Sequence, residues 1–415
     1  MRRKIREIGP LFILPTVGLL VGSLLLLILV PLYIEWNWPN PHGTATTALI
    51  SPDQLRVSPP AWSPVNDSII IRLDDKMYSV QADGSGFREI EQHQREVPFE
   101  MAMSSQGRLA YHAQRDDGWL KKLMSIFHDF SWQRSRMHLV DVSAEETHRV
   151  ASVKGTFRLR PPAWSPNGQF LAYATKTGVE VRDDSGREIS EIPFSTREQG
   201  LLFEDMIGNM APGEVAMSDD GHLAVIATDG WWSPDRTTGR FALLAFRAGD
   251  AAPQILLTAE GGAALFSPVW SRDGERVLYL HAEGDDLSLR AIRLTDGVEE
   301  TISTLGGASD HPEHLRPEYA MSLAPNGRTA LLVDRQINST ALHTVDLESG
   351  DHQPLVDLPY PLFPSWSPDG NRIAVVSPRQ QPWLLYTISP SGGPNRWSLL
   401  QIGKEGQIEL GQNWP

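Results

Sequence analysis

From residue 58 almost to its C-terminus, the chain alternates short apolar runs with short polar turns. Each run is too short for a helix and is bounded by turn-forming residues, which favours a buried β-strand. Seven runs recur at the same place in a repeated unit: Ile69-Ile70-Ile71, Leu109-Ala110-Tyr111, Leu171-Ala172-Tyr173, Leu223-Ala224-Val225, Val277-Leu278-Tyr279, Thr329-Ala330-Leu331 and Ile373-Ala374-Val375.

An anchor residue, aromatic or large and apolar, lies shortly before each run and begins a phrase similar to Ser-Pro-Asp-Gly. The anchors are Trp62, Met103, Trp164, Met217, Trp270, Leu323 and Trp366. In such a phrase Pro presets φ, Asp or Asn hydrogen-bonds the nearby backbone, and Gly accepts a left-handed conformation. Each phrase therefore predicts a tight turn between two strands.

The anchors are separated by 41, 61, 53, 53, 53 and 43 residues. Gly-containing turns such as Asp296-Gly297 follow a third strand in five copies, so each unit holds about four strands, as a propeller blade does. The predicted fold class is all-β, a seven-bladed β-propeller, with six or eight blades as alternatives. A blade cannot bury both of its faces alone, so we expect the anchors to fill the gaps between neighbouring blades.

On these phrases and runs the sequence resembles the TolB-type β-propeller repeat, over roughly residues 58–410. The resemblance implies the propeller fold and no particular activity, because such propellers serve many functions. We expect no counterpart of the N-terminal domain of TolB, so the partners of TolB are not implied.

Closure of the ring is expected to need a strand from one terminus that completes the blade begun by the other. The two candidates for this outermost strand are residues 44–57 and residues 397–402, and we favour the second.

The N-terminal region predicts a membrane anchor. Residues 8–34 contain no charged side chain, and four basic residues precede them. This pattern predicts a cytoplasmic tail (1–10), a transmembrane helix (11–34), a linker (35–57) and an extracytoplasmic propeller (58–415). A cleaved signal peptide is the alternative, although no small-residue cleavage site follows promptly. The expected location is a cell membrane, single-pass, in a prokaryote.

Composition limits the chemistry. The chain has no Cys, which excludes disulfides and a thiol nucleophile, and its net charge of −14 disfavours nucleic acid as a partner. No phosphate-binding, dinucleotide-binding or zinc-helix motif is present, so we expect no cofactor.

Two insertions depart from the repeat. At about residues 117–137, apolar side chains at helical spacing predict an amphipathic helix that packs on the propeller, docks a partner or lies on the membrane. Its apolar side consists of Trp119, Leu120, Leu123, Met124, Phe127 and Phe130. In the second insertion Trp231 and Trp232 either anchor an interface or cap their blade.

Loops that enter the innermost strands gather at the mouth of a propeller channel, where binding sites are common. The candidates there are Arg56, Arg158, Arg160, Glu204, Asp205, Arg316 and Glu318. His311 and His314 form a weak candidate for a metal site because a third ligand cannot be named.

The first function hypothesis is a protein-interaction or scaffold module that holds other proteins or envelope components. One form of this hypothesis is an accessory subunit of a membrane complex. The first alternative is a hydrolase or lyase that uses Glu204, Asp205 or Glu318. The second is a sensor of small ligands.

Overall fold

The computed structural model describes residues 60–73, 76–90, 96–115, 135–142, 148–154, 161–175, 178–193, 211–228, 240–247, 253–284, 286–305, 321–335, 340–358, 362–377, 383–391, 397–402 and 408–413. These residues form strands and turns, and they include no apolar helix of membrane-spanning length. The predicted tail (1–10), transmembrane helix (11–34) and linker (35–57) lie outside the described residues.

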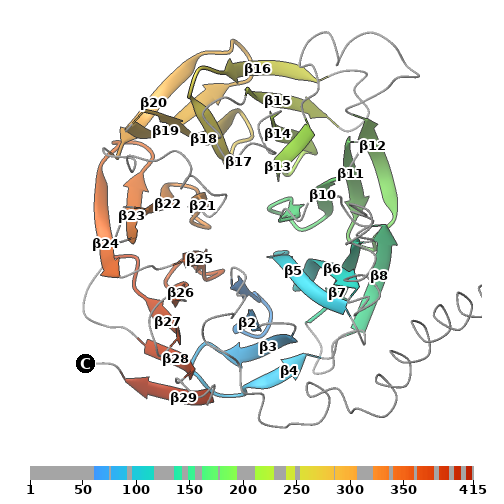
Figure 1. Ribbon diagram of the computed structural model, residues 1–415, viewed down its shortest axis with the longest axis vertical. Helices are drawn as coiled ribbons and strands as arrows, with labels where there is room; N and C mark the ends of the chain where they lie inside the picture. Colours follow the sequence, from blue (N-terminus) through green and yellow to red (C-terminus); the bar gives the residue numbers. More distant parts are fainter. Residues whose placement is uncertain are drawn as a thin grey trace, which may run out of the picture. The chain divides into compact units, whose positions relative to one another are not determined.

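Seven antiparallel sheets form a ring around a central opening (Figure 1), and each sheet is one blade. The predicted seven-bladed β-propeller is therefore confirmed, and the alternatives of six or eight blades are not. Blade 1 contains β1 (Ala61–Trp62), β2 (Ser68–Leu73), β3 (Lys76–Gln81) and β4 (Arg88–Ile90), and blade 2 contains β5 (Glu96–Met103), β6 (Arg108–Arg115), β7 (Ser135–Asp141) and β8 (His148–Lys154). Blade 3 contains β9 (Ala163–Trp164), β10 (Phe170–Ala174), β11 (Gly178–Asp183) and β12 (Glu188–Pro193), and blade 4 contains β13 (Ala211–Met217), β14 (His222–Thr228), β15 (Phe241–Arg247) and β16 (Gln254–Ala259).

The other three blades continue the pattern, and the last has one strand more than the others. Blade 5 contains β17 (Ala264–Trp270), β18 (Arg276–Glu283), β19 (Asp286–Arg293) and β20 (Glu299–Thr304), and blade 6 contains β21 (Met321–Leu323), β22 (Thr329–Arg335), β23 (Thr340–Asp346) and β24 (His352–Leu358). Blade 7 contains β25 (Leu362–Trp366), β26 (Ile373–Ser377), β27 (Trp383–Ile388), β28 (Trp397–Ile402) and β29 (Ile408–Asn413). The labelled first strands β5, β13, β17, β21 and β25 lie innermost in their blades (Figure 1).

The repeated phrase forms the predicted turn between the first and second strands. In blade 7, the Gly370 N–H donates to Ser367 O at 2.9 Å, and Gly370 has φ of 72°, a conformation that favours glycine. The Asp369 carboxylate accepts the Ser367 hydroxyl at 2.5 Å and the Asn371 N–H at 3.0 Å, so the side chains of the phrase fix its backbone.

Each anchor lies at the end of the first strand and pairs with the apolar run that follows it, as Trp366 pairs with Ile373. Three Trp anchors also bond to the preceding blade. The indole N–H groups of Trp164, Trp270 and Trp366 donate to the carbonyls of Ala102, Ala216 and Ser322. The anchors therefore join neighbouring blades, as the sequence predicts.

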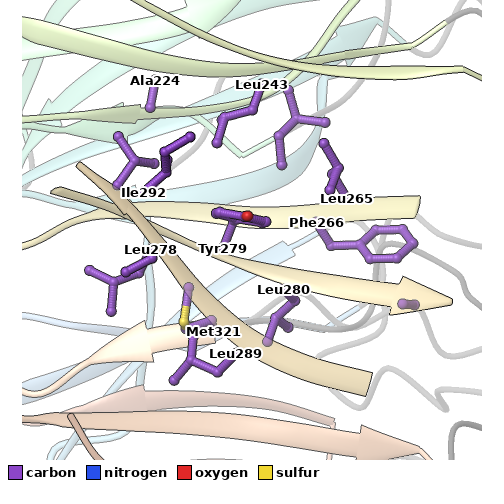
Figure 2. Close-up of a cluster of buried hydrophobic side chains, with 14 of the residues drawn as sticks. Ala224, Leu243, Leu265, Phe266, Leu278, Tyr279, Leu280, Leu289, Ile292 and Met321 are labelled. Atoms are coloured by element: carbon purple, nitrogen blue, oxygen red, sulfur yellow. The ribbon is translucent and has the colours of Figure 1, made fainter. Parts of the chain in front are cut away.

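The apolar runs are buried between blades. The largest cluster extends over blades 4, 5 and 6, and Figure 2 shows Tyr279 within it, among Leu243, Leu265 and Leu278. Tyr279 and Leu243 are fully buried. Burial of apolar area between blades is the main favourable contribution to folding, at roughly 25 cal/mol per Å².

The described strands do not show the predicted mode of ring closure. Among them every blade consists of consecutive strands, and none is exchanged between the first and last blades. The other candidate, residues 44–57, lies outside the described residues. Trp397–Ile402 is the fourth strand of blade 7, and β29 pairs with it from outside. Side chains close the ring instead, because Trp62, Ile69 and Ile71 of blade 1 share an apolar cluster with blade 7.

Candidate functional site

The antiparallel order of the strands gives the propeller two distinct faces. Connections between the second and third strands of a blade, and connections from one blade to the next, begin and end on one face, which we term the loop face. Turns between the first and second strands, and between the third and fourth, lie on the other, which we term the turn face. The longest intervals between strands, 116–134, 194–210, 229–240 and 305–320, all belong to the loop face.

On the turn face, the phrase turns of neighbouring blades contact one another. The Gln106 amide donates to Asn167 O at 2.9 Å between blades 2 and 3, and the Asn167 amide donates to Asp219 O at 3.2 Å between blades 3 and 4. Between blades 5 and 6, Arg272 donates to the carbonyls of Pro325 and Asn326, both at 3.4 Å. These contacts link consecutive blades along the turn face.

A polar cavity of about 750 Å³ opens on the turn face between blades 6 and 7. We term it the 6/7 pocket. It is lined by Asn326, Thr329, Thr344, Asp346, Ser349, Asp351, His352, Gln353, Trp366, Gly370, Pro390 and Ser391. The described lining includes two carboxylates and neither Lys nor Arg.

The carboxylate of Asp346 also shapes the local turn. It accepts the N–H groups of Ser349 and Glu348, each at 2.9 Å. These bonds, with a smaller contribution from the charge of Arg328, lower the pKa of Asp346, so it is ionised at neutral pH. A negative charge is therefore fixed at the wall of the 6/7 pocket.

The equivalent pocket between blades 5 and 6 has a volume of only about 320 Å³, and its charged lining residues are Arg272, Asp273 and Arg276. Arg272 is the third residue of its phrase, where blade 6 has Pro325. Each of these two residues faces the glycine of the next blade: a Cβ on Gly327 would lie 2.9 Å from the Arg272 Cβ, and one on Gly370 would lie 3.4 Å from the Pro325 Cδ. The two junctions thus have the same architecture with different side chains.

Two clusters of buried polar side chains lie inside other blades. In blade 3 the Tyr173 hydroxyl donates to Glu180 at 2.5 Å and accepts from Arg182 at 2.8 Å. In blade 5 Tyr279 donates to Glu299, which also pairs with Arg290, both at 2.8 Å. Burial, followed by the bond to the carboxylate, raises the pKa of both tyrosines, so they stay neutral hydrogen-bond donors. These clusters stabilise the interiors of two blades.

No protein-family model matches the chain. A curated relative, the "Uncharacterized peptidase YuxL" of Bacillus subtilis (strain 168), is 28% identical over 157 residues, which cover 36% of this chain and 20% of that protein. The match thus extends over a fifth of the relative's length.

Solved structures show similarity of fold. A structure from a study of two prolyl endopeptidases is 13% identical with a TM-score of 0.54, and the match covers 86% of this chain and half of that one. TolB from Acinetobacter baumannii is 15% identical with a TM-score of 0.41, over 71% of this chain and 62% of that one. The chain is a seven-bladed β-propeller. This architecture agrees with the propeller fold that the resemblance of the sequence repeats implies.

The site residues predicted from the sequence all lie outside the described part of the propeller. They are Arg56, Arg158, Arg160, Glu204, Asp205, Arg316 and Glu318 at the channel mouth, His311 and His314, the helix residues Trp119, Leu120, Leu123, Met124, Phe127 and Phe130, and Trp231 and Trp232. Because β7 begins at Ser135, the insertion expected over 117–137 ends before that residue. Within the described ranges, no group of three His, Asp or Glu side chains could hold a metal ion.

Sequence reasoning missed the 6/7 pocket. Asn326, Trp366 and Gly370 belong to phrases whose pattern indicates only a turn and an anchor, and Thr329 is part of an apolar run typical of an ordinary strand. The signal is visible only when the blades are aligned on their anchors, because blade 6 then has Pro325 and Thr329 where blade 5 has Arg272 and Arg276.

Proposed function

We propose that this propeller is a protein-interaction module, attached to a membrane by its N-terminal segment, that holds other proteins at its loop face. The observation that carries the proposal is the placement of the longest connections. Four of them leave the loop face, whereas all the connections on the turn face are shorter. Loops carried by a rigid scaffold are where proteins most often place binding residues.

Rigidity supports the same function. The second strands are almost fully buried, and the Trp anchors bond from blade to blade. A fixed ring holds its loops in position, so less conformational entropy is lost when a partner binds.

The sequence adds chemistry to the loop face and to the membrane attachment. The interval 116–134 contains the predicted apolar stripe, and 229–240 contains Trp231 and Trp232. Exposed aromatic residues are good interface anchors. The uncharged segment 11–34, preceded by basic residues, supports attachment with the propeller outside the cytoplasm.

The alternative of a hydrolase or lyase is not favoured. Structural neighbours include peptidases and an oligogalacturonate lyase, at identities of 13% and 12%. At such identities the likeness concerns the fold alone, and one fold supports many functions.

The test is partner retention by the full-length chain. Proteins that co-purify after mild detergent extraction would be compared between the wild type and the double variant Leu123→Asp, Phe127→Asp. We expect the variant to lose them, because charge on the apolar stripe opposes burial against a partner. Circular dichroism would confirm that the propeller remains folded.

A matched control is Val298→Asp. Val298 is 52% exposed in a turn of the turn face, so the same change of chemistry is made away from the proposed docking face. The control should keep every partner. Retention of all partners by the double variant would refute docking through this stripe.

A further inference from the structure

The repeats supply an internal comparison at the junctions where the next anchor is Trp. We define the flanking position of a blade as the residue just before the one that pairs with its anchor. At the four junctions that lead to Trp164, Trp270, Trp366 and Trp62, the flanking residues of the preceding blades are Arg108, His222, Thr329 and Arg372. Three of the four are basic, and blade 6 differs.

Two of these basic residues contact the Trp anchor of the next blade. The guanidinium of Arg372 lies 5.0 Å from the ring centroid of Trp62, and the ring of His222 lies 5.9 Å from that of Trp270. Arg372 also pairs with Asp67 at 2.8 Å. A cation over a Trp face beside a carboxylate is a favourable arrangement.

Blade 6 has Thr329 in this position, and Thr329 and Trp366 both line the 6/7 pocket. The short side chain of Thr329 leaves the space that arginine occupies at the junction between blades 7 and 1. The cavity of about 750 Å³ is within the usual range for a ligand site.

A buried hydroxyl is a second and independent feature of the pocket. Thr344 is 5% exposed, and its Oγ1 has no hydrogen-bond partner within the described part of the chain. It pairs with Leu331, as Ala291 pairs with Leu278 in blade 5, so the two occupy equivalent places. The side chain is directed toward blade 7, because Leu342, two residues earlier on the same strand face, packs against that blade. A polar group with no partner near a cavity points to a ligand.

The charge around the pocket selects a cation. Asp346 and Asp351 line it without a Lys or Arg among the described lining residues. The smaller pocket between blades 5 and 6 has two arginines, Arg272 and Arg276, and one carboxylate, Asp273, and blade 6 has Pro325, Thr329 and Asn326 at these positions. Arginine occupies the flanking position in blade 5 (Arg276) and in blade 7 (Arg372). Its planar group stacks on aromatic rings while donating to several acceptors.

We propose that the 6/7 pocket binds a guanidinium group, placed against Trp366 and beside Asp346 and Asp351. The group comes either from an arginine side chain of a partner's peptide segment or from a free guanidinium compound. The site lies on the turn face and is independent of the proposed docking at the loop face.

Calorimetric titration of the full-length protein in detergent tests this site. The probes are a short peptide with blocked ends and one arginine, the same peptide with citrulline, and arginine amide. We expect saturable binding of the arginine peptide, at one per chain, and at least about tenfold weaker binding of the uncharged citrulline peptide. Similar affinity of arginine amide would indicate a free compound, and clearly tighter binding of the peptide would indicate a partner segment.

The deciding variant is Thr329→Arg, which gives blade 6 the flanking residue that blade 7 already has. This variant should fill the pocket and abolish binding. The control is Gln254→Arg, which introduces an arginine at an exposed strand position of blade 4 and should bind as the wild type does. A second variant, Asp351→Asn, should weaken binding at low salt, with the difference shrinking as salt is added. Unchanged binding by both pocket variants, equal binding of the citrulline peptide, or no saturable binding to the wild type would overturn the proposal.

Discussion

At the scale of the residue, the carboxylates of the phrase turns are hydrogen-bond acceptors as well as charges. Asp273 accepts the Ser271 hydroxyl at 2.5 Å and the Glu275 N–H at 3.0 Å, and these bonds, in that order, lower its pKa. Asp369 makes the same bonds, with the same effect on its pKa. Blades 3 and 6 have Asn167 and Asn326 at this position, so the turn itself does not require a charge.

This difference predicts how acid affects stability. A carboxyl whose pKa is lowered on folding stabilises the protein above its unfolded pKa, and this stabilisation is lost as the pH falls through the folded pKa. The double variant Asp273→Asn, Asp369→Asn should therefore lose less stability than the wild type between about pH 5 and pH 3. Urea unfolding followed by circular dichroism across this range measures the difference. Parallel pH profiles of the two proteins would show that these carboxylates do not contribute.

At the scale of the element, the anchor determines how one blade meets the next. The anchor at the end of the first strand is Trp in blades 1, 3, 5 and 7, and it is Met or Leu in blades 2, 4 and 6. Trp270 is 6% exposed and donates to Ala216 O at 3.3 Å, across the junction from blade 4. The anchor thus contributes both apolar contact and a bond to the neighbouring blade.

We predict that Trp270→Ala lowers the free energy of unfolding by about 3–5 kcal/mol, because it leaves a cavity between two blades. Trp270→Met should cost clearly less, since Met217 fills the same place in blade 4. The urea midpoints of the two variants, compared with that of the wild type, decide the question. Equal losses would mean that the volume of the anchor is not what joins the blades.

The elements show which features a single sequence can reveal. The phrase turns and the apolar runs are local patterns, so the number of blades, the turns and the place of the anchors could all be predicted. Strand β29 follows no phrase and was not predicted. The 6/7 pocket depends on two blades that contact only after folding, and its signal is the lack of a basic residue at Thr329. The predicted loop-face site stays a prediction, because its residues lie outside the described ranges.

At the scale of the whole molecule, a ring must close where its two chain ends meet. Among the described residues the first and last blades share no strand, and side chains join them (Figure 1). Asp67 accepts the Trp62 indole N–H and the Arg372 guanidinium, both at 2.8 Å, and Arg372 also covers the ring of Trp62. Every other junction also has a covalent connection between its blades.

Removal of Arg372 should therefore loosen this junction more than an equal change elsewhere. In Arg372→Ala, we expect faster backbone hydrogen exchange in the strands of blades 1 and 7, since opening there breaks no covalent connection. Arg272→Ala is the matched control, because Arg272 bonds across the junction between blades 5 and 6, which residues 305–320 connect. Its effect should be small and confined to its own turn. Hydrogen exchange measured by mass spectrometry resolves the two regions, and equal effects of the two variants would show that the contacts of Arg372 are not what keeps the ring closed.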